Sequence, residues 1–221
     1  MHPQLQAHRF HALAGWLWVL VFASPLHAVR AAEPVSAQAL VERSVLGMRF
    51  DPEASKRDAD EALKLLARTP NADLEIRARI VLCDYQSERD KAAAEREIAT
   101  ATALLPRAQR PGLRAGVLTC QGDLNETAGD NTQANALYER AVAVATDAHD
   151  DEMLAGALFS RGYLLGVQGQ YSTGLADLRR GQSLYEKSNM PLHAVTVLNA
   201  IAILYNRMGD YAQAVHIYTR A

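Results

Sequence analysis

The sequence predicts an all-α protein in which helix-turn-helix pairs stack into a solenoid. The last stretch, 198–221, is apolar at helical spacing, is broken at Met208-Gly209-Asp210, and is then apolar at helical spacing again. This pattern indicates two antiparallel helices joined by a tight turn. A similar pattern recurs upstream at steps of 40 residues. The composition agrees, because 49% hydrophobic but only 6% aromatic residues suit a helical core of alanine and leucine.

Residues 1–31 differ from the rest of the chain and have the anatomy of a secretory signal peptide. Arg9 precedes an apolar run over 12–23, which Ser24 and Pro25 end, and candidate cleavage sequences follow at 26–28 and 29–31, as in export signals. An uncleaved membrane anchor is the alternative, although a span needs roughly 17–25 apolar residues. We therefore expect a periplasmic or other extracytoplasmic location, with inner-membrane anchorage of the full-length protein as the alternative.

The helical array is expected over residues 35–221, in about five pairs. The first pair, 39–50 and 52–67, has no clear repeat signature, which suits an atypical repeat that caps the stack. The second pair carries Leu82 where other copies have a small residue, and Arg89-Asp90 where they have a glycine turn, so it is a degenerate copy. Good copies follow over 118–141 and 158–181, and the last copy ends, incomplete, at Ala221.

The prolines support these boundaries independently of the repeat pattern. Proline lacks an N–H and clashes with the preceding helical turn, so it belongs at helix ends. Each proline after the leader falls at an expected helix boundary: Pro34, Pro52, Pro70, Pro106, Pro111 and Pro191.

The last copy shows a fixed order of side-chain sizes. Its large residues are Leu198, Ile201, Tyr205, Tyr211 and Tyr218, and its small residues are Ala202, Ala214 and Ala221. This order, with glycine and aspartate at the turn, resembles the tetratricopeptide (TPR) repeat, here of a long-period type of about 40 residues. The resemblance covers 35–221 and implies a right-handed superhelix with a concave groove lined mainly by the first helix of each pair.

The resemblance also implies which side chains face the groove. Carried over from the family's groove positions, they include Arg79, Asp123, Glu126, Phe159, Tyr163, Asn199, Asn206 and Arg207. Asn199 and Asn206 are seven residues apart on one helical face, and an amide can donate to and accept from a peptide backbone. We expect a protein, a peptide or a small ligand as the partner. The alternative for the asparagines is a solvated polar face.

No catalytic, metal or cofactor site is expected in these 221 residues. Asp123 and Glu126 could form an acid–base pair or half of a metal site, but no histidine or cysteine lies near them at ligand spacing. We therefore expect an exposed acidic helix face there. The formal net charge of −2 also gives no basic excess for nucleic acid.

Cys83 and Cys120 are the two cysteines of the chain, on the first helices of neighbouring repeats. Export would permit a disulfide. A bridge needs Cα atoms within about 7 Å, whereas packed helix axes are about 8–10 Å apart. A disulfide and two buried or groove-lining thiols both remain open.

Exported long-period TPR arrays resemble the periplasmic input regions of bacterial membrane-bound GGDEF proteins, which are diguanylate cyclases. The resemblance implies a sensory module in the N-terminal part of a signalling protein. Because Ala221 falls in the middle of a second helix, we expect further repeats, a membrane span and an output domain to follow. The alternatives are a free-standing periplasmic scaffold or assembly factor, and an end whose exposed apolar face is covered by dimerisation.

Overall fold

The computed structural model describes residues 35–219 and shows an all-α solenoid, which confirms the predicted fold class. No strand occurs among these residues. The predicted leader, 1–31, lies outside the described residues. The helices are α1 (Ala37–Gly47), α2 (Pro52–Leu66), α3 (Ala72–Gln86), α4 (Lys91–Leu104), α5 (Leu113–Thr127), α6 (Asn131–Asp147), α7 (Asp151–Val167), α8 (Tyr171–Lys187), α9 (Pro191–Arg207) and α10 (Tyr211–Tyr218), with a 3₁₀ turn η1 (Leu105–Arg107) after α4.

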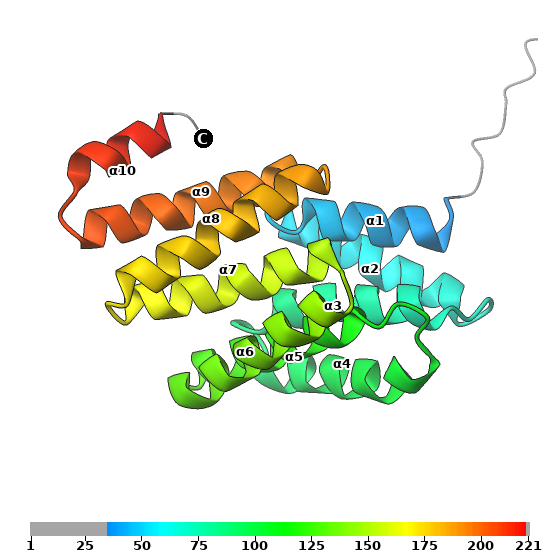
Figure 1. Cartoon of the computed structure of the whole chain (residues 1–221). Helices are drawn as coiled ribbons and strands as arrows, with labels where there is room; N and C mark the ends of the chain where they lie inside the picture. The colour runs from blue at the N-terminus through cyan, green and yellow to red at the C-terminus, as the bar shows by residue number, and fades with distance from the viewer. Residues whose placement is uncertain (1–34, 220–221) are drawn as a thin grey trace, which may run out of the picture. The chain divides into compact units, whose positions relative to one another are not determined.

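Consecutive helices pack against one another along the described chain, as Figure 1 shows from blue α1 to red α10. The first helices of successive pairs, α1, α3, α5, α7 and α9, also contact their neighbours in the stack. This arrangement is that of a TPR-type repeat array. None of the helices within 35–219 is both long and apolar enough to cross a membrane.

Aspartate begins most of the helices in this array. The side chains of Asp51, Asp90, Asp130, Asp150 and Asp210 each accept a hydrogen bond from the backbone N–H three residues later. The first N–H groups of a helix have no partner within the helix, and a carboxylate at this position satisfies one of them and favours the positive helix end. The aspartates therefore fix where each of these helices starts.

The tight turns within the last three pairs have the same backbone conformation. Gly129, Gly169 and Gly209 have φ angles of 84°, 88° and 81°, in the left-handed region that glycine enters without steric cost. Two turns between pairs use His149 and Asn189 in this region, with φ angles of 52° and 56°. Both sets recur at steps of 40, so the repeat pattern that the sequence shows is a pattern of turns.

The two helices of the fourth pair approach each other most closely at glycines. A Cβ atom added to Gly162 on α7 would lie 2.8 Å from the carbonyl oxygen of Gly174 on α8, and one added to Gly174 would lie 2.6 Å from that of Gly162. Real Cβ atoms do not come this close to other atoms, so both positions need glycine. The small residue that the sequence pattern predicts at 162 therefore has a packing reason.

The second pair departs from the step of 40 in its first helix. Cys83, not Leu82, is the small buried residue that packs against Ala94 and Ile98 of α4, as Gly122 packs against Tyr138 in the next pair. Cys83 and Gly122 are 39 residues apart, whereas the helix-capping Asp90 and Asp130 are 40 apart. The loop between α3 and α4 has absorbed one extra residue, which is why this copy looks degenerate in sequence.

The end of α1 reaches the fourth and fifth pairs. Val45 of α1 packs against the core cluster of α7, α8 and α9, which includes Ala155, Tyr185 and Ala194. The first pair therefore does more than cover one end of the stack, because its last residues lie in the groove.

Candidate ligand-binding groove

The groove contains an enclosed part and an open part. The enclosed part, called the cavity here, has a volume of about 130 Å³ and is lined from α1, α3, α5, α7 and the start of α9. The open part, called the mouth, has a volume of about 580 Å³. Five residues line both parts, so the cavity adjoins the mouth: Arg49, Asp84, Asp123, Phe159 and Ser160.

Arg49, just after α1, marks the boundary between cavity and mouth. Its guanidinium lies 3.1 Å from the carboxylate of Asp84 and 5.8 Å from the centre of the Phe159 ring, within reach of a cation–π interaction. Asp84 raises the pKa of Arg49, although 36% of this side chain is exposed. The pair connects the end of α1 to α3 and places one positive charge beside the acidic mouth.

The mouth is lined by more carboxylates than cations. Asp84, Glu88, Asp123 and Glu126 line it, and Arg49 is the one cation among its lining residues. Burial, together with the charge of Asp84, raises the pKa of Asp123 from 3.8 to about 7. The mouth therefore has an excess of negative charge even when Asp123 is protonated.

Tyr138 holds the two carboxylates of α5 from behind. Its hydroxyl oxygen lies 2.7 Å from Oδ1 of Asp123 and 2.8 Å from Oε2 of Glu126. A phenol has one proton to donate, so two carboxylates cannot both accept from it. One carboxyl must donate to the phenolic oxygen instead, which agrees with the raised pKa of Asp123. The expectation of an exposed acidic helix face at 123 and 126 is therefore wrong, because Tyr138 draws both side chains into partial burial.

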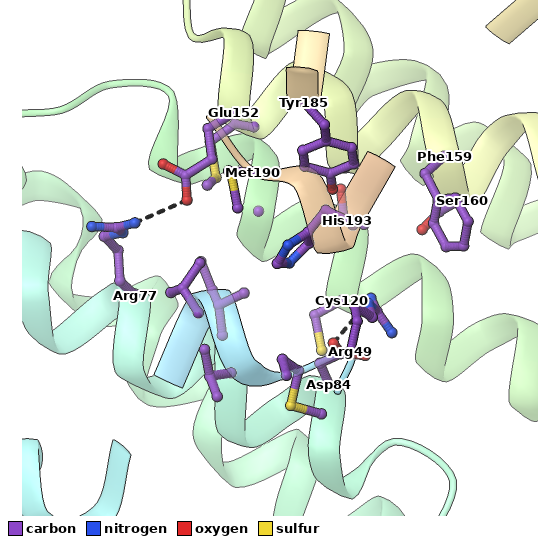
Figure 2. Close-up of a pocket in the computed structure, with 18 of the residues that line it drawn as sticks. Arg49, Arg77, Asp84, Cys120, Glu152, Phe159, Ser160, Tyr185, Met190 and His193 are labelled. Carbon is purple, nitrogen blue, oxygen red and sulfur yellow. Dashed lines mark hydrogen bonds and ion pairs between the residues drawn. The ribbon is translucent and has the colours of Figure 1, made fainter. Parts of the chain in front are cut away.

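The inner wall of the cavity carries a buried histidine. His193, on the first turn of α9, is 8% exposed, and its ring centre lies 5.1 Å from that of Tyr185. Burial and the charge of Arg49 lower its pKa to about 4, so the imidazole is neutral at pH 7. Its Nδ1 atom is buried without a hydrogen-bond partner. Figure 2 shows the ring directed into the space between α9 and the end of α1.

An ion-pair network closes the opposite end of the cavity. Arg77 on α3 donates to Glu152 on α7 at 2.9 Å, as Figure 2 shows. Arg110 donates to the other oxygen of Glu152 at 2.9 Å and to both oxygens of Asp150 at 2.7 and 2.6 Å. These carboxylates raise the pKa of Arg110. The network joins α3 and the loop before α5 to the start of α7, which sets the width of the groove.

The residues predicted for the groove fall into three groups. Asp123, Glu126, Phe159 and Tyr163 line the mouth. Arg79 does not, because the one-residue shift of α3 turns it toward α4, where it pairs with Glu97 at 2.7 Å and with Glu75 at 2.8 Å. The groove positions of α3 are taken by residues that sequence reasoning missed: Arg77, Ile80, Asp84 and Ser87.

Asn199, Asn206 and Arg207 are exposed on α9, outside the cavity and the mouth. Their part in binding stays a prediction. Sequence reasoning also missed Arg49 and His193. Arg49 belongs to the pair that carries no repeat signature, and His193 looks isolated until the curvature of the array brings α9 to α1.

Cys83 and Cys120 form a disulfide, with Cα atoms 6.4 Å apart. Cys120 also lines the cavity. The bridge connects α3 to α5 directly below Asp84 and Asp123, the residues that follow these cysteines by one and three positions. Within 35–219, no group of three or more His, Cys, Asp or Glu side chains is placed to hold a metal ion.

The outer face of the last helix is apolar and exposed. Tyr211, Val215 and Tyr218 of α10 are all exposed, and Ile217 is half-buried.

Comparison with known proteins supports the fold alone. No family model matches the sequence, and no curated protein matches it. A Rap protein complexed with Competence and Sporulation Factor is similar in structure, with a TM-score of 0.59 and 14% sequence identity over 83% of this chain and 62% of the Rap chain. This chain thus spans less than two thirds of the Rap protein. BtubC (BKLC) from P. vanneervenii has a TM-score of 0.57 and 17% identity, over 85% of this chain and 72% of BtubC.

Proposed function

We propose that residues 35–221 form a protein-interaction module that binds a peptide or protein segment in the groove. The observation that carries the proposal is the cavity of about 130 Å³ that adjoins an acidic mouth on the concave side of a helical repeat array. Repeat arrays use such concave surfaces for binding, and an apolar pocket with a few polar groups is the usual form of a ligand site. The similar Rap structure is itself a complex with a second molecule.

The more detailed part of the proposal concerns the cellular role. We propose that the module is exported behind the leader 1–31 and serves as the input region of a signalling protein, such as a GGDEF diguanylate cyclase. The apolar segment 12–23 and the TPR-type array support this role. The coding sequence beyond Ala221 tests it, since a membrane span and a GGDEF domain are expected there. A stop codon soon after a capping helix would support a free-standing periplasmic scaffold instead.

Photo-crosslinking in living cells tests the binding role. A photo-reactive amino acid at position 88, on the rim of the mouth, should give a covalent adduct with a partner protein or peptide. The matched control is the same amino acid at position 180 on α8, which is exposed and lies outside both cavity and mouth. Adducts at 180 but not at 88, or at neither position, would contradict a binding groove.

A further inference from the structure

The cavity has the size of one aromatic ring. Its volume is about 130 Å³, and a buried apolar cavity of about 150 Å³ can hold benzene. Three methionines line it, Met48, Met153 and Met190, together with Phe159. Thioether sulfur makes favourable contacts with aromatic rings, and methionine adjusts its shape to an inserted group. The cavity therefore suits an aromatic side chain.

The polar atoms of the cavity call for a hydroxyl on that ring. Four buried side-chain nitrogen or oxygen atoms in the described part of the chain have no hydrogen-bond partner, and two of them, Nδ1 of His193 and Nε of Arg77, belong to residues that line this cavity. A neutral imidazole nitrogen is a donor or an acceptor according to its tautomer, and the guanidinium N–H is a donor. A phenolic hydroxyl both donates and accepts, so it can pair with His193 in either tautomer. Phenylalanine would leave Nδ1 unpaired.

The mouth beside the cavity calls for a cation. Glu88 and Glu126 line it with Asp84 and Asp123, and Arg49 is already paired with Asp84 at 3.1 Å. Cavity and mouth adjoin, and neighbouring residues of an extended peptide are about 3.3–3.6 Å apart along the chain. One peptide segment can therefore place a side chain in each.

We propose that the groove binds a peptide segment in which a tyrosine is adjacent to a lysine or arginine. The tyrosine ring occupies the cavity and its hydroxyl bonds to Nδ1 of His193, while the basic side chain lies among the carboxylates of the mouth. This inference rests on the proposed function and adds the chemistry of the partner.

Calorimetric titration of the protein with four acetylated tetrapeptide amides tests the inference. Gly-Tyr-Lys-Gly should bind at least tenfold more tightly than Gly-Ala-Lys-Gly or Gly-Tyr-Glu-Gly, and more tightly than Gly-Phe-Lys-Gly. Equal affinities for the four peptides, or binding of none, would overturn the inference. Free tyramine is the fifth probe. If it binds as tightly as Gly-Tyr-Lys-Gly, the site takes a free aromatic amine and the peptide assignment is wrong.

Two pairs of variants assign the two parts of the site. His193→Phe keeps an aromatic ring beside Tyr185 but removes the nitrogen, so it should abolish the preference for Tyr over Phe peptides. His216→Phe, at an exposed position on α10, is its control. Glu88→Gln should weaken Gly-Tyr-Lys-Gly several-fold without affecting Gly-Tyr-Glu-Gly in the same direction, and Glu95→Gln on exposed α4 is its control. Unchanged preferences in His193→Phe and Glu88→Gln would overturn the assignment.

A blocking variant covers the case in which His193→Phe fails to fold. A Cβ atom added to Gly156 would meet only the Tyr185 hydroxyl, at 3.4 Å, so Gly156→Leu should fold, extend into the cavity and abolish binding of Gly-Tyr-Lys-Gly. Full binding by folded Gly156→Leu would contradict the inference. The crosslinking at position 88 separates the two proposals. Adducts there without tetrapeptide binding would reject the partner chemistry and leave the binding role in place.

Discussion

Cys83 on α3 is bonded to Cys120 on α5, with Cα atoms 6.4 Å apart and 37 positions between them in sequence. The bridge spans two pairs of the array that otherwise meet through helix packing. A crosslink of this span restricts the unfolded chain and stabilises a protein by roughly 2–4 kcal/mol. Urea unfolding with and without reductant should show a loss of this size. Cys83→Ala/Cys120→Ala should show no further loss on adding reductant, and rapid alkylation of both thiols before reduction would contradict the bridge.

The close contact of Gly162 with α8 predicts a large effect of a single methyl group. Gly162→Ala places a Cβ atom 2.8 Å from the carbonyl oxygen of Gly174, and overpacking of this kind costs about 1–3 kcal/mol. Gly162→Leu should cost more. Gly156→Ala on the same helix is the control, because its Cβ has room and alanine is favoured over glycine in a helix by about 0.5–1 kcal/mol. Equal thermal stability of the two alanine variants would remove the register assigned to α7 and α8.

The environment of Asp123 predicts a loss of stability as the pH rises. Its folded pKa is about 7, against 3.8 for the free carboxyl, so between these values the folded state holds a proton that the unfolded state has released. The contribution of Asp123 to stability therefore falls as pH rises from about 4 to 7, by at most about 4 kcal/mol. The charged groups that act on it are Asp84, Arg49 and Glu126, and Tyr138 is bonded to it.

Asp123→Asn tests this pH dependence. The amide mimics the protonated carboxyl, since its NH₂ can donate to the hydroxyl oxygen of Tyr138. Urea unfolding at pH 5 and pH 8 should show little change at pH 5 and a gain in stability at pH 8. Other titrating groups, including His193, are common to both proteins and cancel in the comparison. An equal effect at both pH values would mean that Asp123 is ionised throughout.

The asparagines of α9 give a prediction outside the cavity. Asn199 and Asn206 are exposed, so their replacement by alanine should leave the circular dichroism spectrum and the thermal midpoint unchanged. If their amides bond to the backbone of a partner, the yield of crosslinked adduct from position 88 should fall in Asn199→Ala/Asn206→Ala. An unchanged yield would show that the partner does not extend along α9.

The repeat pattern was predictable because turns and caps are local. Gly129, Gly169 and Gly209 stand 40 residues apart and have nearly the same φ, so a simple step along the sequence finds them. The position of Arg79 was not predictable in this way. One extra loop residue between α3 and α4 shifts the groove face of α3 from Arg79 to Arg77 and Asp84, while Asp90 keeps its place as a cap.

The inner half of the site could not be predicted from the sequence at all. The contact of α1 with the fourth and fifth pairs results from small rotations summed over the whole array, and no local pattern encodes that sum. His193 therefore has no sequence signal that connects it to Arg49, although both line the cavity. Asp123 and Glu126 have the right spacing to be found, but their partial burial depends on Tyr138, which lies on another helix.

The central claim is that a partner's side chain enters the cavity between α1, α3, α5, α7 and α9. Methyl NMR of protein labelled at methionine measures this directly, because Met48, Met153 and Met190 line the cavity, while Met208, 45% exposed in the turn before α10, lies outside it. On addition of Gly-Tyr-Lys-Gly, the account predicts large shifts of the three cavity methyls and none of Met208. A shift confined to Met208, or no shift of any methyl at saturating peptide, would contradict it.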